Sequence, residues 1–145
     1  MSFTICAYKN KQDVIVINPT AKDSIGAGSS TNQIFLLEPE HEIDAIGLKL
    51  KEAFEFCNRE PFLNEHISGN LPDLLGYSSR SKFVKEHVHV IISVRSNLDK
   101  VLFTPMKREG NGYMNNGSTK IELAITATNE QLGQGLLDAF NLCKR

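Results

Sequence analysis

Apolar side chains recur at intervals of three, four and seven residues in two segments, a spacing that predicts amphipathic helices. The first segment begins near His41 and ends near Arg59, and the second follows Thr128. Thr128 and Gln131 form the pattern of a capping box, which places the start of the second helix. The first apolar stripe consists of Ile43, Ile46, Leu50, Ala53, Phe54 and Cys57, and the second of Leu132, Leu136, Phe140 and Cys143.

Alternation of apolar and polar residues, with β-branched side chains, predicts six strands at 4–8, 14–18, 33–37, 88–95, 100–106 and 120–126. Pro105 indicates that its strand lies at a sheet edge or ends there. Ser79 or Ser81 can cap a brief helix that runs toward Glu86. Two segments rich in Gly, Asn and Ser, 23–32 and 108–119, are predicted to be flexible loops.

The two predicted helices share residues in register: Gly47 with Gly133, Leu50 with Leu136, Ala53 with Ala139, Phe54 with Phe140, Cys57 with Cys143 and Arg59 with Arg145. A strand precedes each helix at the same offset. The chain is therefore expected to form one pseudo-symmetric α+β domain, 1–145, of duplicated β-β-β-α units with antiparallel pairing. The halves are about 1–59 and 83–145, joined by a connector at 60–82 with a short helix.

The repeated positions carry two structural expectations. A glycine inside a helix costs about 1 kcal/mol relative to alanine. Gly47 and Gly133 are therefore expected to mark a close contact between each helix and the sheet. Leu50, Phe54, Leu136 and Phe140 are expected to be buried.

Composition places the chain among globular proteins, with 41% hydrophobic and 23% charged residues. No signal-peptide pattern opens it, and no apolar run approaches the ~20 residues of a membrane span. A cytoplasmic location is the resulting expectation. Cys6, Cys57 and Cys143 are far apart and form no CxxC pair, so they are expected to be reduced and largely buried.

The net charge of -1 conceals an uneven distribution. Residues 38–65 hold eight carboxylates and three basic side chains, whereas residues 80–108 hold seven basic side chains and two carboxylates. This asymmetry is typical of an electrostatically steered partner surface. Two solvated faces that pair with one another explain it equally well.

No constellation of catalytic or metal-binding residues emerges. His87 and His89 share one strand face, but no third ligand stands at metal-site spacing. The loop at 26–30 precedes a strand and lacks the Gly-Lys-Ser/Thr of a phosphate-binding loop. The expectation is a protein without enzymatic activity, catalytic residues, metal or cofactor.

The order of motifs resembles that of the contact-dependent growth inhibition (CDI) immunity proteins, the CdiI family. Two helices read Gly-x-x-Leu-x-x-Ala-Phe-x-x-Cys, from Gly47 and from Gly133. Between them, residues 76–84 read Gly-Tyr-Ser-Ser-Arg-Ser-Lys-Phe-Val, and residues 129–133 open the closing helix. The resemblance covers most of the chain beyond Gln33. The segment 110–119 and Gln134-Gly135 depart from it.

The resemblance implies a cytoplasmic protein that binds the C-terminal toxin domain of a cognate CdiA effector, often a nuclease, one-to-one. It implies no membrane partner and no fixed set of interface residues. Because nucleases are basic where they meet phosphate, an inhibitor is expected to offer carboxylates. The candidate toxin-binding residues are Glu38, Glu40, Glu42, Asp44, Glu52 and Glu55.

The alternative is a single-stranded nucleic-acid-binding protein, because duplicated strand-strand-strand-helix units also resemble the whirly-type architecture. Such a protein needs aromatic and basic side chains on its exposed sheet face. This chain has no Trp, and its strands alternate mostly with aliphatic residues. Nucleic acid is therefore the less favoured partner.

Overall fold

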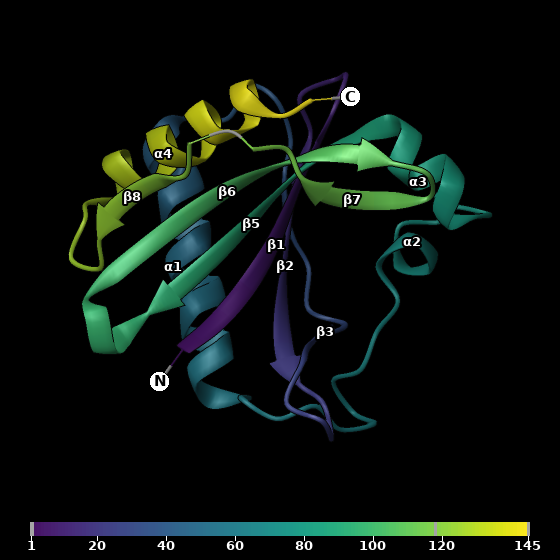
Figure 1. Ribbon diagram of the computed structural model, residues 1–145, viewed down its shortest axis with the longest axis horizontal. Coiled ribbons are helices and arrows are strands. Elements are labelled where there is room, and N and C mark those ends of the chain that lie inside the picture. Colours follow the sequence, from purple (N-terminus) through teal and green to yellow (C-terminus); the bar gives the residue numbers. More distant parts are fainter. Residues whose placement is uncertain (1, 118, 145) are drawn as a thin grey trace.

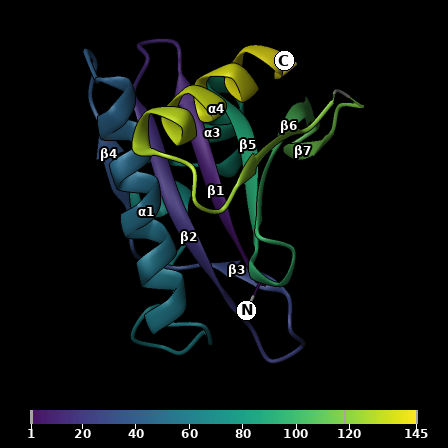
Figure 2. The ribbon, with the colours of Figure 1, turned by 90° about the vertical axis from the view of Figure 1, so that its left-hand side faces the viewer.

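A curved antiparallel sheet carries two long helices on one of its faces, as the computed structural model shows for residues 2–117 and 119–144 (Figures 1 and 2). The helices are α1 (Ile43–Arg59), α2 (Leu71–Leu74), α3 (Arg80–Glu86) and α4 (Asn129–Leu142), with a 3-10 turn at Ser96–Leu98. The strands are β1 (Ser2–Asn10), β2 (Ile15–Lys22), β3 (Gly28–Ser30), β4 (Phe35–Leu37), β5 (His87–Arg95), β6 (Lys100–Glu109), β7 (Gly112–Asn115) and β8 (Ile121–Ala124).

The sheet has the order β3-β2-β1-β5-β6-β7, with β4 also paired to β2 and β8 to β6. All of these pairings are antiparallel, which confirms the predicted α+β class. The two halves use the same scheme: β1-β2-β4 and then α1, and β5-β6-β8 and then α4. At the centre of the sheet, Cys6 of β1 lies opposite Ile91 of β5. The duplication itself stays a prediction.

Pro105 lies inside β6, so the strand does not end there; on the side away from β5, however, Pro105 has no partner strand, as at a sheet edge. Residues Lys100 to Phe103 pair with β8 and residues Met106 to Glu109 pair with β7. Pro105 therefore lies in the gap between two partner strands, where its missing N–H is not needed for the ladder. Pro19 occupies the matching gap of β2, between the residues that pair with β4 and those that pair with β3.

Both segments that were predicted to be flexible loops contain a short strand. β3 pairs with β2, and its end is held by Asn18, whose buried amide donates to the carbonyls of Thr31 and Gln33. β7 forms a hairpin with β6, and Gly110 at φ +56° makes the tight turn. β3 was missed because it consists of Gly and Ser, and β7 because only two residues, Tyr113 and Met114, separate Gly112 from Asn115. Ser118 in the second segment, and Arg145, the counterpart of Arg59, lie outside the described residues.

The main core lies between the sheet and the pair α1 and α4. Leu50, Leu136 and Phe140 are buried there, as predicted. Phe54 was predicted to be buried but is half-buried, and its ring packs at the core margin against Phe3 with centroids 5.9 Å apart. Phe56 is buried instead, at 7% exposure, outside the predicted stripe.

Gly47 and Gly133 mark a contact between α1 and α4 and not, as predicted, between each helix and the sheet. The backbone of Asn129 lies against Gly47, and the backbone of Ile43 lies against Gly133. Each glycine thus leaves room for the first turn of the other helix, because a side chain at either position would push α1 and α4 apart. The pairing holds both helices on the same face of the sheet (Figure 2).

Candidate functional site

Six carboxylates follow the outer side of α1 and the segment that leads into it. Glu38 and Glu40 lie between β4 and α1, Glu42 is the N-cap residue, and Asp44 lies in the first turn. Negative charge at this end of a helix is favoured by the helix dipole. Further along, Glu55 is exposed, whereas Glu52 is half-buried and accepts a bond of 3.1 Å from Lys49 Nζ. The structure thus brings Asp44, Glu52 and Glu55 to the side of α1 that faces away from the core.

Leu48 is an exposed apolar side chain between Asp44 and Glu52 on the outer side of α1, and the sequence reasoning missed it. Asp44 precedes it by one helical turn and Glu52 follows it by one turn, so the three lie on one side of α1. Its exposed fraction is 48%. We call Leu48 and the six carboxylates the α1 surface. An apolar centre with a charged rim is the composition of many protein–protein interfaces.

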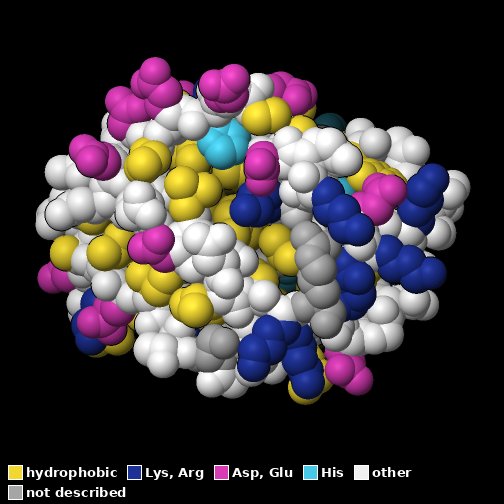
Figure 3. Space-filling model, turned by 90° about the horizontal axis from the view of Figure 1, so that it is seen from above, with side chains coloured by type: hydrophobic (Ala, Val, Ile, Leu, Met, Phe, Trp, Pro, Cys, Tyr) yellow, Lys and Arg dark blue, Asp and Glu magenta, His cyan; other side chains and the backbone are white. Residues whose placement is uncertain are grey.

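A second charged region lies on α3 and the β6–β7 hairpin. Lys82 and Lys85 of α3 are exposed, and Lys107 and Arg108 of β6 are half-buried. Figure 3 shows the result from above: Asp and Glu side chains gather along one margin of this face, and Lys and Arg side chains along the opposite margin. The two charge classes thus predominate on different parts of this face.

Arginine and tyrosine side chains hold α3 against the hairpin. Arg108 Nε donates to the Val84 carbonyl at 2.9 Å, and its guanidinium also donates to the Lys85 carbonyl. Arg80 Nε donates to the Asn111 carbonyl at 3.0 Å. The Tyr113 hydroxyl donates to the His87 carbonyl at 3.0 Å. The arginines thus satisfy backbone carbonyls at the end of α3 and in the turn of the hairpin.

The two neighbouring histidines belong to an aromatic cluster under α3. His89 is buried, stacks on Tyr8 with centroids 4.4 Å apart, and its Nδ1–H donates to the Ala7 carbonyl. His87 stacks on Phe83 and bonds to the Phe83 carbonyl in the same way. Burial lowers the pKa of His89 to about 4, so the imidazole is neutral near pH 7. Both rings therefore have a structural role in packing.

The thiols are free, and their surroundings do not favour the reactive thiolate. Burial raises the pKa of Cys57 to about 12 and that of Cys6 to about 11. Within residues 2–117 and 119–144, no three His, Cys, Asp or Glu side chains are grouped so that they could hold a metal ion.

Two solved structures share this fold. The protein of unknown function NMB0488 from Neisseria meningitidis has a TM-score of 0.76 and 12% identity, over 99% of this chain and 96% of that chain. A chain of the CdiA-CT/CdiI toxin and immunity complex from Yersinia pseudotuberculosis matches with a TM-score of 0.72 and 14% identity, over 99% of this chain and 98% of that chain. At these identities the likeness establishes the fold alone. No curated protein matches the chain in sequence.

None of the described helices has the length and apolar character needed to cross a membrane.

The family model described as CDI immunity protein matches residues 64–143, which include α2, α3, the second half of the sheet and α4. Because this match covers more than half of the 145 residues, the chain belongs to the CDI immunity protein (CdiI) family.

Proposed function

We propose that this protein binds the C-terminal toxin domain of a cognate CdiA effector, one-to-one, in the cytoplasm and neutralises it without catalysis of its own. Family membership and the fold shared with a chain of a CdiA-CT/CdiI toxin and immunity complex support this function. We further propose that the toxin is a nuclease, and that binding covers its active site or its substrate-binding site.

The α1 surface is the proposed contact region, and the observation that carries it is Leu48 among six carboxylates. A basic phosphate-binding surface of a nuclease complements these charges, and the charges increase the rate of encounter. The exposed leucine supplies apolar area that is removed from water on binding, at about 25 cal/mol per Å². The charges thus increase the association rate, and burial of Leu48 slows dissociation.

The test is a triple charge reversal on the α1 surface, Glu42→Lys, Glu52→Lys and Glu55→Lys. All three positions lie outside the buried stripe, so the fold is expected to persist, as circular dichroism can verify. The Kd for the toxin domain is expected to rise at least tenfold, and protection of toxin-expressing cells to fall.

The matched control reverses three exposed carboxylates elsewhere, Asp73→Lys, Glu109→Lys and Glu130→Lys, with the same change in net charge. This control is expected to retain most of the affinity. If the α1 variant binds and protects like the control, the α1 surface is a solvated face and the interface lies elsewhere. If the wild-type protein does not bind the toxin at all, the proposed function is wrong.

A further inference from the structure

Two cavities lie next to one another along β1. The second lies on the sheet face opposite α1 and α4, and the first lies beyond the last residue pair of β1 and β2, Ile5 with Pro19, where it reaches Cys57 of α1. One has a volume of about 240 Å³ and the other of about 200 Å³. Both are lined by Thr20 and Gly28, so they are adjacent. Together they follow β1 from Ser2 to Tyr8, a length of roughly 20 Å at the rise of a β-strand. We call this feature the open-face groove.

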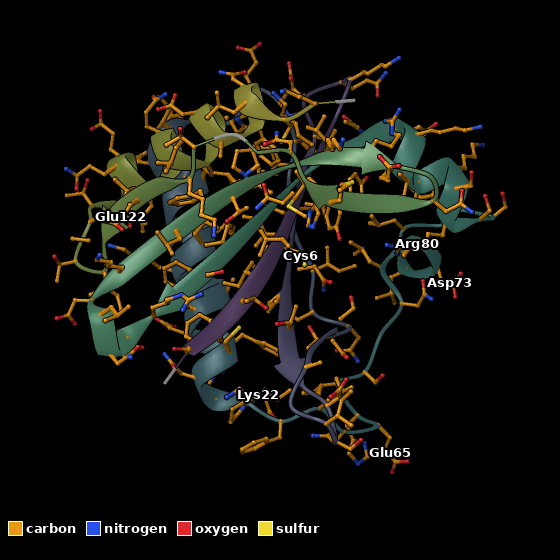
Figure 4. All side chains as sticks on the ribbon, in the orientation of Figure 1. Cys6, Lys22, Glu65, Asp73, Arg80 and Glu122 are labelled. Atoms are coloured by element: carbon orange, nitrogen blue, oxygen red, sulfur yellow. The ribbon has the colours of Figure 1, made fainter. Side chains whose placement is uncertain are left out.

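The charged side chains that line the open-face groove are all basic. Lys22 and Arg95 line its first cavity and Arg80 lines the second, and no described Asp or Glu lines either. Figure 4 shows Cys6 in the middle of this face, with Lys22 below it and Arg80 to its right. The charges are thus distributed along the groove, which suits a ligand with more than one negative group.

Several polar side chains between these charges already make hydrogen bonds within the protein. Thr20 Oγ1 donates to the Thr4 carbonyl at 2.7 Å, and Ser30 Oγ donates to the Asn18 side chain. Arg80 is fixed through Nε by the Asn111 carbonyl, which leaves its terminal nitrogens for a ligand. A ligand therefore gains most from the basic groups, which can form charge-assisted hydrogen bonds with carboxylates.

The aromatic residues of the lining distinguish a peptide from a nucleic acid. Tyr8 stacks on His89, Phe83 stacks on His87, and Phe3 packs against Phe54. Each of these rings is engaged by another ring, and Phe83 is also buried, whereas single-stranded nucleic acids stack on exposed aromatic faces. An extended acidic peptide does not require free aromatic faces, because it can lie along the groove and pair its carboxylates with Lys22, Arg80 and Arg95.

We infer that the open-face groove binds an extended acidic segment of the toxin domain. This inference rests on the proposed function and adds a second contact, of opposite charge, to that of the α1 surface. The toxin would then be recognised at a basic surface and at an acidic segment. A partner with only one of the two would be bound less tightly.

The experiment measures toxin binding by titration calorimetry for Lys22→Glu/Arg95→Glu and, separately, for Ser93→Trp, which fills the first cavity without a change in charge. The matched control, Lys11→Glu/Lys120→Glu, reverses two exposed basic residues outside the groove. Each groove variant is expected to raise the Kd at least tenfold, and the control to stay within about twofold of wild type. Thermal unfolding verifies that each variant is folded, and Lys22→Gln/Arg95→Gln replaces the reversal if it is not.

If both groove variants bind the toxin with the Kd of the wild type, the inference is wrong and the proposed function stays intact. Absence of wild-type binding would refute the proposed function itself. A fluorescent single-stranded oligouridine serves as the second probe. If it binds to the wild type and Lys22→Glu/Arg95→Glu abolishes that binding, the groove is a nucleic-acid site and the peptide inference is wrong.

Discussion

Gly47 and Gly133 make reciprocal contacts between the two long helices. A Cβ atom on Gly47 would lie 1.8 Å from the carbonyl oxygen of Asn129, and one on Gly133 would lie 1.9 Å from that of Ile43. Each obstructing atom belongs to backbone four residues before the other glycine. A shift of either helix that relieves the contact at one glycine therefore also changes the contact at the other, so the two contacts are coupled.

Gly47→Ala and Gly133→Ala are each expected to lower the free energy of unfolding by about 2–3 kcal/mol or more, because backbone must move to admit the methyl group. In an unobstructed helix the same change stabilises by about 1 kcal/mol. Urea unfolding measures the effect. Gly135→Ala is the control, since its Cβ would meet side chains of Leu123 and Phe103 at 3.0 and 3.2 Å, and these can shift. A stabilised Gly47→Ala protein would contradict the helix contact.

Phe140→Ala is expected to lower the free energy of unfolding by about 3–5 kcal/mol, because the ring is buried against the sheet. Phe54→Ala is expected to cost less, about 1–3 kcal/mol, because this ring is half-buried. Chemical denaturation of both variants gives the comparison. Equal losses would mean that the two repeated positions are packed alike, contrary to the structure.

Stability is expected to fall as the pH drops from about 6.5 to about 4, partly because of His89. Burial lowers its pKa to about 4, so in this range the unfolded chain binds a proton that the folded chain does not. Above pH 6.5 His89 is neutral in both states and the folded protein keeps its full stability. Between pH 6.5 and pH 4 only the unfolded chain binds the proton, so the free energy of unfolding falls by about 3 kcal/mol in total. Urea midpoints between these pH values measure it. His89→Gln should flatten the dependence, and an unchanged slope would assign the effect to other groups.

Leu48→Ala is expected to weaken binding of the toxin domain by about 1 kcal/mol or more, because an apolar anchor at the centre of an interface is lost. Stability should change little, since Leu48 is 48% exposed. Leu98→Ala is the matched control, with 53% exposure at the turn between β5 and β6. Surface plasmon resonance compares the two. An equal effect of both substitutions on dissociation would exclude Leu48 from the interface.

The association rate with the toxin is expected to fall when NaCl is raised from about 0.05 M to about 0.5 M, because salt screens charges farther apart than the Debye length. The dissociation rate should change less, since packed apolar contacts determine it. Stopped-flow mixing resolves both rates. The triple reversal of Glu42, Glu52 and Glu55 should reduce the salt dependence. An association rate independent of salt would argue against steering by the α1 surface.

Much of the fold could be predicted because its signals are local. Periodicity located α1 and α4, alternation located β5 and the first part of β6, and Thr128 with Gln131 formed the expected capping box. The strands that were missed, β3 and β7, are held by distant partners. Their Gly, Ser and Asn residues form strands only because β2 and β6 offer free edges.

The candidate site could be predicted only in part, for a similar reason. The six carboxylates were visible as a cluster in the sequence, but Leu48 was visible only as one more apolar residue of a helix. Its outward direction follows from the periodicity, because Leu48 lies two residues from Ile46 and from Leu50 of the predicted stripe, but its place between Asp44 and Glu52 was not used. The open-face groove depends on distant residues, because Lys22, Arg80 and Arg95 come together only when the sheet has formed.

The bonds that attach α3 to the hairpin have a consequence for sequence change. Arg108, Arg80 and Tyr113 all donate to main-chain carbonyls, which every amino acid supplies. The outward side chains of α3, such as Lys82 and Lys85, can therefore be exchanged without loss of these bonds. The exposed residues of α3 can thus change while the position of the helix against the hairpin stays fixed.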